Sequence, residues 1–161
     1  KAVYREEGLY ILCTAKTYKF TESNYVSGKA NNAIAFRNTS LEVQIVKPAG
    51  GNAQIWITSY GNVLPRKIES AFSVTPQTVG TGAESRTLYN VTIEAFVSAD
   101  ALKQLLGVTS LDDALSIAAV FTNVSAQGDS GLSSDPINGG AVTVTTSGFY
   151  GTFDKITVEK Q

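Results

Sequence analysis

Hydrophobic and polar residues alternate along several stretches of the chain, and this alternation is the strongest structural signal in the sequence. In SLEVQIVK (40–47), AQIWITSY (53–60) and LYNVTIEAFV (88–97), hydrophobic residues recur at every second position. Alternation with many Val, Ile and aromatic residues predicts β-strands with one buried face. KPAGGN (47–52) separates the first two stretches and is typical of a hairpin turn.

Further strands are predicted from less regular patterns. GLYILCTAK (8–16) is hydrophobic on both faces, which indicates a central strand covered on both sides. NAIAFRN (32–38) and KIESAFSVT (67–75) are also predicted strands. AVTVTTSGFY (141–150) and TFDKITVEK (152–160) form a predicted final hairpin. The residues of this hairpin expected to face the core are Val142, Val144, Ile156 and Val158.

One helix interrupts the strands. In SADALKQLLG (98–107), Ser98 is a suitable N-cap and Gly107 a suitable stop. Its expected buried stripe is Leu102, Leu105 and Leu106. A short helical turn is expected near 110–115, followed by a strand in SIAAVFTNV (116–124).

Short strands at regular spacing, one helix and a Gly/Ser-rich loop at 125–140 predict an all-β fold. The expected architecture is a β-sandwich, or a jelly-roll-like variant of it, with one short helical insert. The 161 residues suit one domain. We expect an N-terminal arm at 1–7 and a single β-sandwich domain at 8–161.

Composition excludes several classes of protein. A hydrophobic content of 43% argues against a disordered chain. The net charge of −1, with scattered basic residues, argues against a nucleic-acid partner. No run approaches 18 apolar residues, so no membrane span is predicted. The chain starts at Lys1 and has no Met, which favours a removed signal peptide over trimming and so an extracellular or cell-surface location.

The absence of histidine excludes Ser-His-Asp and Cys-His catalysis and histidine-based zinc sites. GDSG (128–131) resembles the nucleophile segment of trypsin-like proteases but has no histidine partner. Cys13 lies between apolar residues and is interpreted as a small buried side chain. The strand acids are expected to point outward into solvent; they are Glu42, Glu69, Glu94 and Glu159. We therefore predict no enzymatic activity and no cofactor.

Five side chains are candidates for modification or ion binding. Asn38, Asn90 and Asn123 each begin an Asn-X-Ser/Thr sequon, and Asn90 falls on the polar face of its strand, so glycans are possible partners. Asp129 and Asp135, in the 125–140 loop, have the oxygen ligands that calcium prefers, but their spacing is not that of a calcium-binding loop. No metal site is therefore predicted.

Trp56 is a candidate contact residue, together with Tyr60. Alternation places Trp56 on the face opposite Ile55 and Ile57, and an outward Trp suggests a surface that binds a sugar or a neighbouring subunit. The alternative is that both faces of this strand are covered within one sandwich.

The arm KAVYREE is the remaining candidate for a functional element. Sandwich domains expose sheet edges, and an added strand can pair with such an edge in another molecule. Ala2 and Tyr4 would present one face of the arm and Val3 the other. Repeated head to tail, this contact gives an open homopolymer.

The order of arm, first core strand GLYILCTAKTYKF, helical insert SADALKQLLG and closing strand FDKITVEKQ resembles a group of secreted sandwich proteins. These are the TasA/camelysin-like biofilm fibre proteins and the archaeal bundling pili and threads. The resemblance covers most of the chain by overall plan. It implies polymerisation outside the cell by donor-strand complementation, a role in biofilms or cell adhesion, and no enzymatic activity.

Three other functions remain open. The main alternative is a secreted carbohydrate-binding or adhesin module that uses Trp56 and Tyr60, with Tyr10 or Tyr18, as a stacking surface. A viral coat or appendage protein would share the fold and the lack of catalytic residues. A hydrolase that uses only carboxylates is the third.

Overall fold

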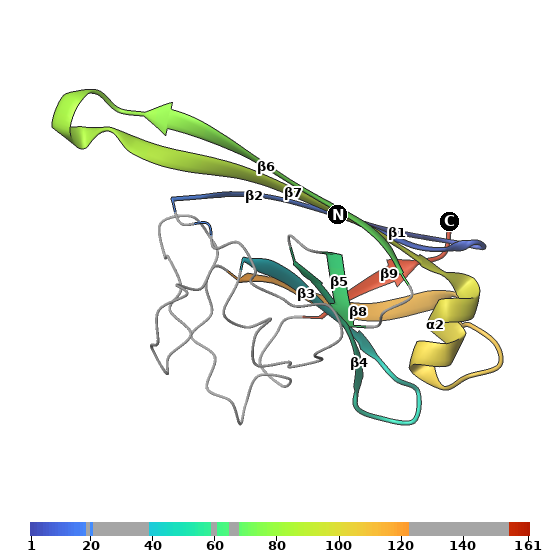
Figure 1. The fold of residues 1–161 in the computed structure, drawn as a ribbon. Coiled ribbons are helices and arrows are strands. Elements are labelled where there is room, and N and C mark those ends of the chain that lie inside the picture. Colours follow the sequence, from blue (N-terminus) through green and yellow to red (C-terminus); the bar gives the residue numbers. More distant parts are fainter. Residues whose placement is uncertain (19, 21–38, 59–60, 65–67, 123–154) are drawn as a thin grey trace.

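A computed structural model describes residues 1–18, 20, 39–58, 61–64, 68–122 and 155–161. These residues form two antiparallel sheets that face one another, with one helix at one end (Figure 1). The predicted β-sandwich with a short helical insert is confirmed.

One sheet has four strands in the order β1-β2-β7-β6, and the other has five in the order β5-β4-β3-β8-β9. The four-stranded sheet comprises β1 (Ala2–Arg5), β2 (Gly8–Thr17), β6 (Glu69–Val79) and β7 (Arg86–Ser98). The five-stranded sheet comprises β3 (Ser40–Val46), β4 (Asn52–Thr58), β5 (Gly61–Leu64), β8 (Ala114–Thr122) and β9 (Ile156–Glu159). The helix is α2 (Ala99–Leu106), and a short 3-10 turn, η1 (Gly82–Glu84), lies at the tip of the β6–β7 hairpin.

The core lies between the sheets and follows the predicted alternation. Val43 and Ile55 are cross-strand partners on the inner face of the five-stranded sheet, and neither is exposed. Ile93 on β7 is likewise fully buried from the opposite side. The apolar residues that recur at every second position are therefore the ones that the two sheets press together.

Local signals fix the helix as predicted. The Ser98 side chain accepts a hydrogen bond from the Ala101 backbone N–H at 3.2 Å, and Gly107 ends the helix in the left-handed conformation. Leu102 and Leu106 are buried against the core.

The helical turn expected near 110–115 is wrong, whereas the strand expected after it is present as β8. In the segment 110–115, two backbone carbonyl groups accept hydrogen bonds from distant parts of the chain. The Asp112 carbonyl accepts from the Tyr4 hydroxyl, and the Asp113 carbonyl accepts from the Lys160 N–H at 2.7 Å. Hydrogen bonds to the Tyr4 side chain and to the C-terminal segment thus take the place of the bonds that a helical turn would make.

The interpretation of residues 8–16 is correct in one respect and wrong in another. β2 does lie between β1 and β7, as a central strand should. Its outer face, however, carries the exposed residues Tyr10, Thr14 and Lys16. No described element covers that face (Figure 1), so its hydrophobic members form a surface patch instead of a second core.

The β6–β7 hairpin is longer than predicted and projects beyond the rest of the sandwich (Figure 1). β9 lies within the predicted strand 152–160 and pairs with β8. The predicted strands at 32–38 and 141–150 and the 125–140 loop lie outside the described residues.

Candidate functional site

The N-terminal arm is an edge strand of its own sheet. β1 pairs antiparallel with β2, from Ala2 opposite Ile11 to Arg5 opposite Gly8. The pairing extends one residue further, because the Leu12 N–H donates to the Lys1 carbonyl at 2.9 Å and the terminal amine donates to the Leu12 carbonyl at 2.6 Å.

Tyr4 anchors this arm between the two sheets. Its side chain is completely buried, and its hydroxyl donates to the Asp112 carbonyl at 2.9 Å. Its own carbonyl accepts from the Gln161 N–H at 2.9 Å, and the Lys160 ammonium lies 5.5 Å from its ring centroid. Burial raises the pKa of the Tyr4 hydroxyl, which keeps it a donor. Ala2 faces the core beside Tyr4, and Val3 faces outward, as predicted.

A two-residue loop, Glu6–Glu7, connects β1 to β2. Both side chains are exposed, and no described residue other than glycine has positive φ. Gly8 follows with φ of 150°, and a Cβ there would collide with the Val97 carbonyl. Two-residue hairpin loops favour Asn-Gly or similar pairs because they require positive φ. The loop that holds the arm therefore lacks the residues that normally stabilise such a turn.

A slot between the sheets opens beside the arm. β1 covers β2 only as far as Leu12, and β9 covers β8 only as far as Ile117, within the part of the chain that the structure describes. Beyond these points a largely apolar cavity of about 470 Å³ lies between the two edges. Ile156 lines this slot and is 58% exposed, although its alternation directs it inward. Other residues that line the slot are Ala2, Ile11, Cys13, Val43 and Phe121.

Cys13 is half-buried in this slot. Burial raises the pKa of its thiol. A raised pKa lowers the thiolate fraction, so the side chain is suited to packing and poorly suited to nucleophilic chemistry.

A buried polar cluster lies on the far side of the five-stranded sheet from the core. The Glu42 carboxylate accepts from Gln44 at 2.8 Å and from Gln54 at 3.0 Å, and Gln44 accepts from Asn52 at 2.9 Å. Glu42 is 1% exposed, so its predicted solvent exposure is wrong. Burial raises the pKa of this carboxyl, while the two amide donors lower it.

Trp56 belongs to the same covered face. It does lie opposite Ile55 and Ile57 in the alternation, but it is only 1% exposed. The prediction of an exposed contact surface at Trp56 is therefore wrong, since both faces of β4 are covered. Tyr60 lies outside the described residues.

Of the predicted modification and ion-binding residues, the structure describes Asn90. It is half-buried on the outward face of β7, and its side-chain amide donates to the Thr75 carbonyl at 3.5 Å. The other candidates, Asn38, Asn123, Asp129 and Asp135, lie outside the described residues.

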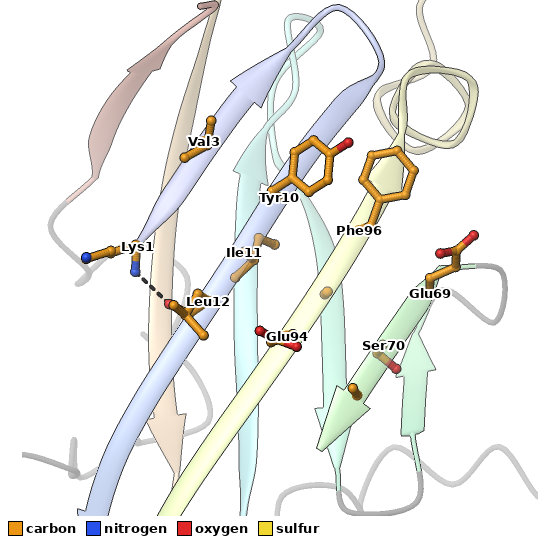
Figure 2. A pocket seen from close by; sticks show the side chains of 11 residues that line it. Lys1, Val3, Tyr10, Ile11, Leu12, Glu69, Ser70, Glu94 and Phe96 are labelled. Atoms are coloured by element: carbon orange, nitrogen blue, oxygen red, sulfur yellow. Dashed lines mark hydrogen bonds between the residues drawn. The ribbon is translucent and has the colours of Figure 1, made fainter. Parts of the chain in front are cut away.

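Two aromatic rings meet on the outward face of the four-stranded sheet. The rings of Tyr10 and Phe96 have centroids 4.6 Å apart and an interplanar angle of 31° (Figure 2). Tyr10 is 39% exposed and its hydroxyl donates to a Glu7 carboxylate oxygen at 3.2 Å. Burial, the Glu7 hydrogen bond and nearby Glu69 raise the pKa of the Tyr10 hydroxyl. Sequence reasoning identified Tyr10 as a possible stacking residue but gave no role to Phe96.

Comparison with protein-family models, curated proteins and solved structures finds no match. Any functional argument therefore depends on the chain itself. Among the described residues, no helix is long and apolar enough to cross a membrane. Within the same part of the chain, no three His, Cys, Asp or Glu side chains gather as metal ligands.

Proposed function

We propose that the protein is a structural subunit of an extracellular filament, assembled head to tail by exchange of β1. In this assembly the arm of each subunit leaves its own sheet and pairs with β2 of the next subunit. The proposal depends on two features of the arm, its buried anchor and the loop that follows it. A strand with a completely buried anchor, Tyr4, is held in place by the unfavourable loop Glu6–Glu7.

Exchange would preserve the contacts of the arm. The pairing partners on β2, the Asp112 carbonyl and the C-terminal Lys160–Gln161 segment all lie outside β1, so a second copy offers the same set. Domain swapping of this kind costs little because the closed and exchanged forms share the same interactions. The loop residues then decide the balance between the two forms.

The loop favours release of the arm. Without positive φ the turn does not match the twist of the paired strands, and its two adjacent exposed glutamates carry like charges. In the exchanged form the chain is extended through Glu6 and Glu7, so both penalties disappear. Opposing this, the short loop gives the arm a high effective concentration near its own sheet. We therefore expect elongation to depend strongly on subunit concentration.

The exchanged contact is heterologous, because one subunit contributes the arm and the other the edge. Such contacts generate open polymers unless the rotation closes a ring. Seven extended residues reach about 23 Å, which is enough to span a neighbouring sheet edge.

The extracellular location and the association with biofilms or adhesion follow from the resemblance of the overall plan to secreted fibre subunits.

Deletion of residues 1–7 tests the proposal. We expect the full chain to form filaments in negative-stain images and the deleted chain to remain unpolymerised. A synthetic peptide with the sequence of residues 1–7 should bind the deleted chain and raise its melting temperature. Elongation of the deleted chain at the normal rate, or no effect of the peptide, would rule out β1 exchange.

A saccharide-binding module is the second candidate function. With Trp56 buried, this function would depend on the exposed Tyr10 ring and its neighbour Phe96, since aromatic faces can stack on sugars. Retention on polysaccharide columns that is lost on Tyr10→Ala would favour it over a purely structural role.

A further inference from the structure

The outward face of the four-stranded sheet carries a row of side chains that runs across all four strands. Val3 on β1 lies opposite Tyr10 on β2, Tyr10 lies opposite Phe96 on β7, and Phe96 lies opposite Glu69 on β6. Figure 2 shows Val3 and the two rings in this order, with Glu69 beyond Phe96. The row is hydrophobic at three of its four positions.

The apolar patch is wider than this single row. Leu12 and Ala71, one step along the strands, line the same shallow depression of about 570 Å³. No described element lies over it (Figure 1). A contiguous exposed apolar patch with polar residues around it is typical of an interaction surface.

Charge is distributed unevenly around this patch. Exposed Lys1 and Arg5 lie on the β1 side, on the same face as Val3 by alternation. Exposed Glu69 and Glu94 lie on the β6 and β7 side. Glu7, bonded to the Tyr10 hydroxyl, adds one negative charge at the loop end of the β1 side, where it offsets part of the positive charge of Lys1 and Arg5. The face is therefore positive at one edge, negative at the other and apolar between them.

We propose that this face binds the same face of a second copy, related by a twofold axis parallel to the strands. This axis places β1 of each copy opposite β6 of the other. Lys1 and Arg5 then face Glu69 of the second copy, and the apolar rows meet in the middle. An axis across the strands would instead place β1 against β1 and β6 against β6. Like charges would then meet, so the first arrangement is favoured.

The size of the face sets the strength of the contact. Four strands about 4.8 Å apart, taken over the five-residue length of Lys1–Arg5, give roughly 300 Å² per copy. Stable complexes bury about 800 Å² per partner, so single pairs should associate weakly. Two sheets that pack face to face align their strands within about 30°, which leaves the charged edges in register.

This contact is distinct from the exchange of β1 and does not depend on it. Val3 and Arg5 complete the patch whether β1 belongs to the same chain or to a neighbour. If filaments form, repetition of the weak contact along two of them would join them laterally through avidity.

Sedimentation velocity on the full chain, Arg5→Glu, Glu69→Lys and their equimolar mixture tests the proposal. Each single reversal should weaken dimer formation at least about tenfold, because it creates like-charge pairs at both edges. The mixture should restore dimers, since Glu at position 5 of one variant then faces Lys at position 69 of the other. Higher salt should weaken the wild-type dimer. A dimer formed by arm exchange has the same mass, but its strand pairing does not join Arg5 to Glu69. Only the face-to-face dimer should therefore respond to the reversals and to their mixture.

Lys16→Glu is the matched control, because Lys16 is exposed on the same face of β2 but several rows from the patch. It should leave the dimer unchanged. A wild-type chain that remains without dimers up to about 1 mM would overturn the proposal. So would reversals that fail to restore association when mixed. Polysaccharide binding that requires Tyr10, with no self-association, would assign the patch to a sugar ligand instead.

Discussion

Tyr4 and Asp112 lie 108 residues apart in the chain, yet the hydroxyl of the first donates to the carbonyl oxygen of the second at 2.9 Å. This bond ties the edge of the four-stranded sheet to the segment that leads into β8. Because the Tyr4 backbone also pairs with Lys160, one residue joins the N-terminal strand to both the five-stranded sheet and the C-terminus. The arm is therefore a structural part of the sandwich, whether it belongs to the same chain or to a neighbouring subunit.

Substitution of Tyr4 should show how firmly the arm is anchored. We expect Tyr4→Phe to lower the free energy of unfolding by about 0.5–1.5 kcal/mol, the usual net contribution of one hydrogen bond. Tyr4→Ala should cost about 3–5 kcal/mol, as truncation of a buried aromatic side chain does. Urea unfolding followed by circular dichroism measures both values.

Val3→Ala is the control for this series, since Val3 is adjacent but half-exposed on the outward face. Its cost should be well below that of Tyr4→Ala. Equal costs at the two positions would show that Tyr4 is not the anchor of the arm.

The loop between β1 and β2 should control polymerisation. Glu6→Asn with Glu7→Gly introduces the pair that two-residue hairpin loops favour. The form in which β1 pairs with its own β2 should become more stable. Elongation, measured by light scattering, should become slower. Residues 1–5 are unchanged, so the arm would still fit a neighbouring edge.

Glu6→Gln with Glu7→Gln separates the two causes of strain in this loop. It removes the charge repulsion but keeps residues that disfavour positive φ. An elongation rate between those of the wild type and the Asn-Gly variant is expected. Faster elongation by the Asn-Gly variant would contradict a role for the loop in arm release.

Cys13 offers a direct probe of the slot beside the arm. Its thiol pKa is raised above the ordinary value of 9.0 by burial, so labelling by a thiol reagent at pH 8 should be slower than that of a free cysteine. Lys1 and Ala2 line the same slot. Removal of residues 1–7 should therefore accelerate labelling. The same rate in the full and the deleted chain would mean that the arm does not shield this side of the sandwich.

Much of the fold follows from local signals in the sequence. The alternation in 40–47 and 53–60 correctly predicts that Leu41 and Ile57 face the core, because cross-strand neighbours on one face of a sheet are buried together. Ser98 and Gly107 set the helix ends by hydrogen bonds within a single turn. Signals of this kind need no knowledge of distant segments.

Burial on the outer faces of the sheets could not be predicted in the same way. Alternation correctly assigns Trp56 and Glu42 to the face away from the core, but it does not show whether another part of the chain covers that face. The reverse error occurs at β2: the stretch 8–16 is predicted to be covered on both faces, whereas Tyr10 on its outward face is exposed. Coverage depends on contacts between residues far apart in sequence, which period-two patterns do not contain.

The candidate site was predicted only in part. The sequence correctly separates KAVYREE from the strand that follows it and places Ala2 and Tyr4 on one face. Pairing of this arm with its own β2 was not predicted, because KAVYREE lacks a recognisable turn pair at Glu6–Glu7. The acidic edge of the outward patch was missed for another reason. Glu69 and Glu94 lie on different strands and become neighbours only through the β6–β7 register.

Glu42 should make the stability of the sandwich depend on pH. Its carboxyl pKa is raised above the ordinary 4.5 by burial, so the folded chain holds this proton at pH values where the unfolded chain has lost it. The free energy of unfolding should therefore fall as the pH rises from about 4.5 through the folded pKa, and the penalty is complete above it. Glu42→Gln has no such proton to lose. Relative to the wild type it should gain stability across this window, and urea unfolding at a series of pH values measures the difference.

The exposed Glu69 provides the matched comparison, because Glu69→Gln removes the same charge from a solvated position. The difference from the wild type in this pH window should be larger for Glu42→Gln than for Glu69→Gln. If the Glu42→Gln profile runs parallel to that of the wild type, the buried carboxylate is stabilised by its two amide donors as fully as by water. In the cluster of Glu42, Gln44 and Gln54, hydrogen bonds would then fully replace the lost hydration of the carboxylate. The contribution of this cluster to the free energy of unfolding would not depend on pH.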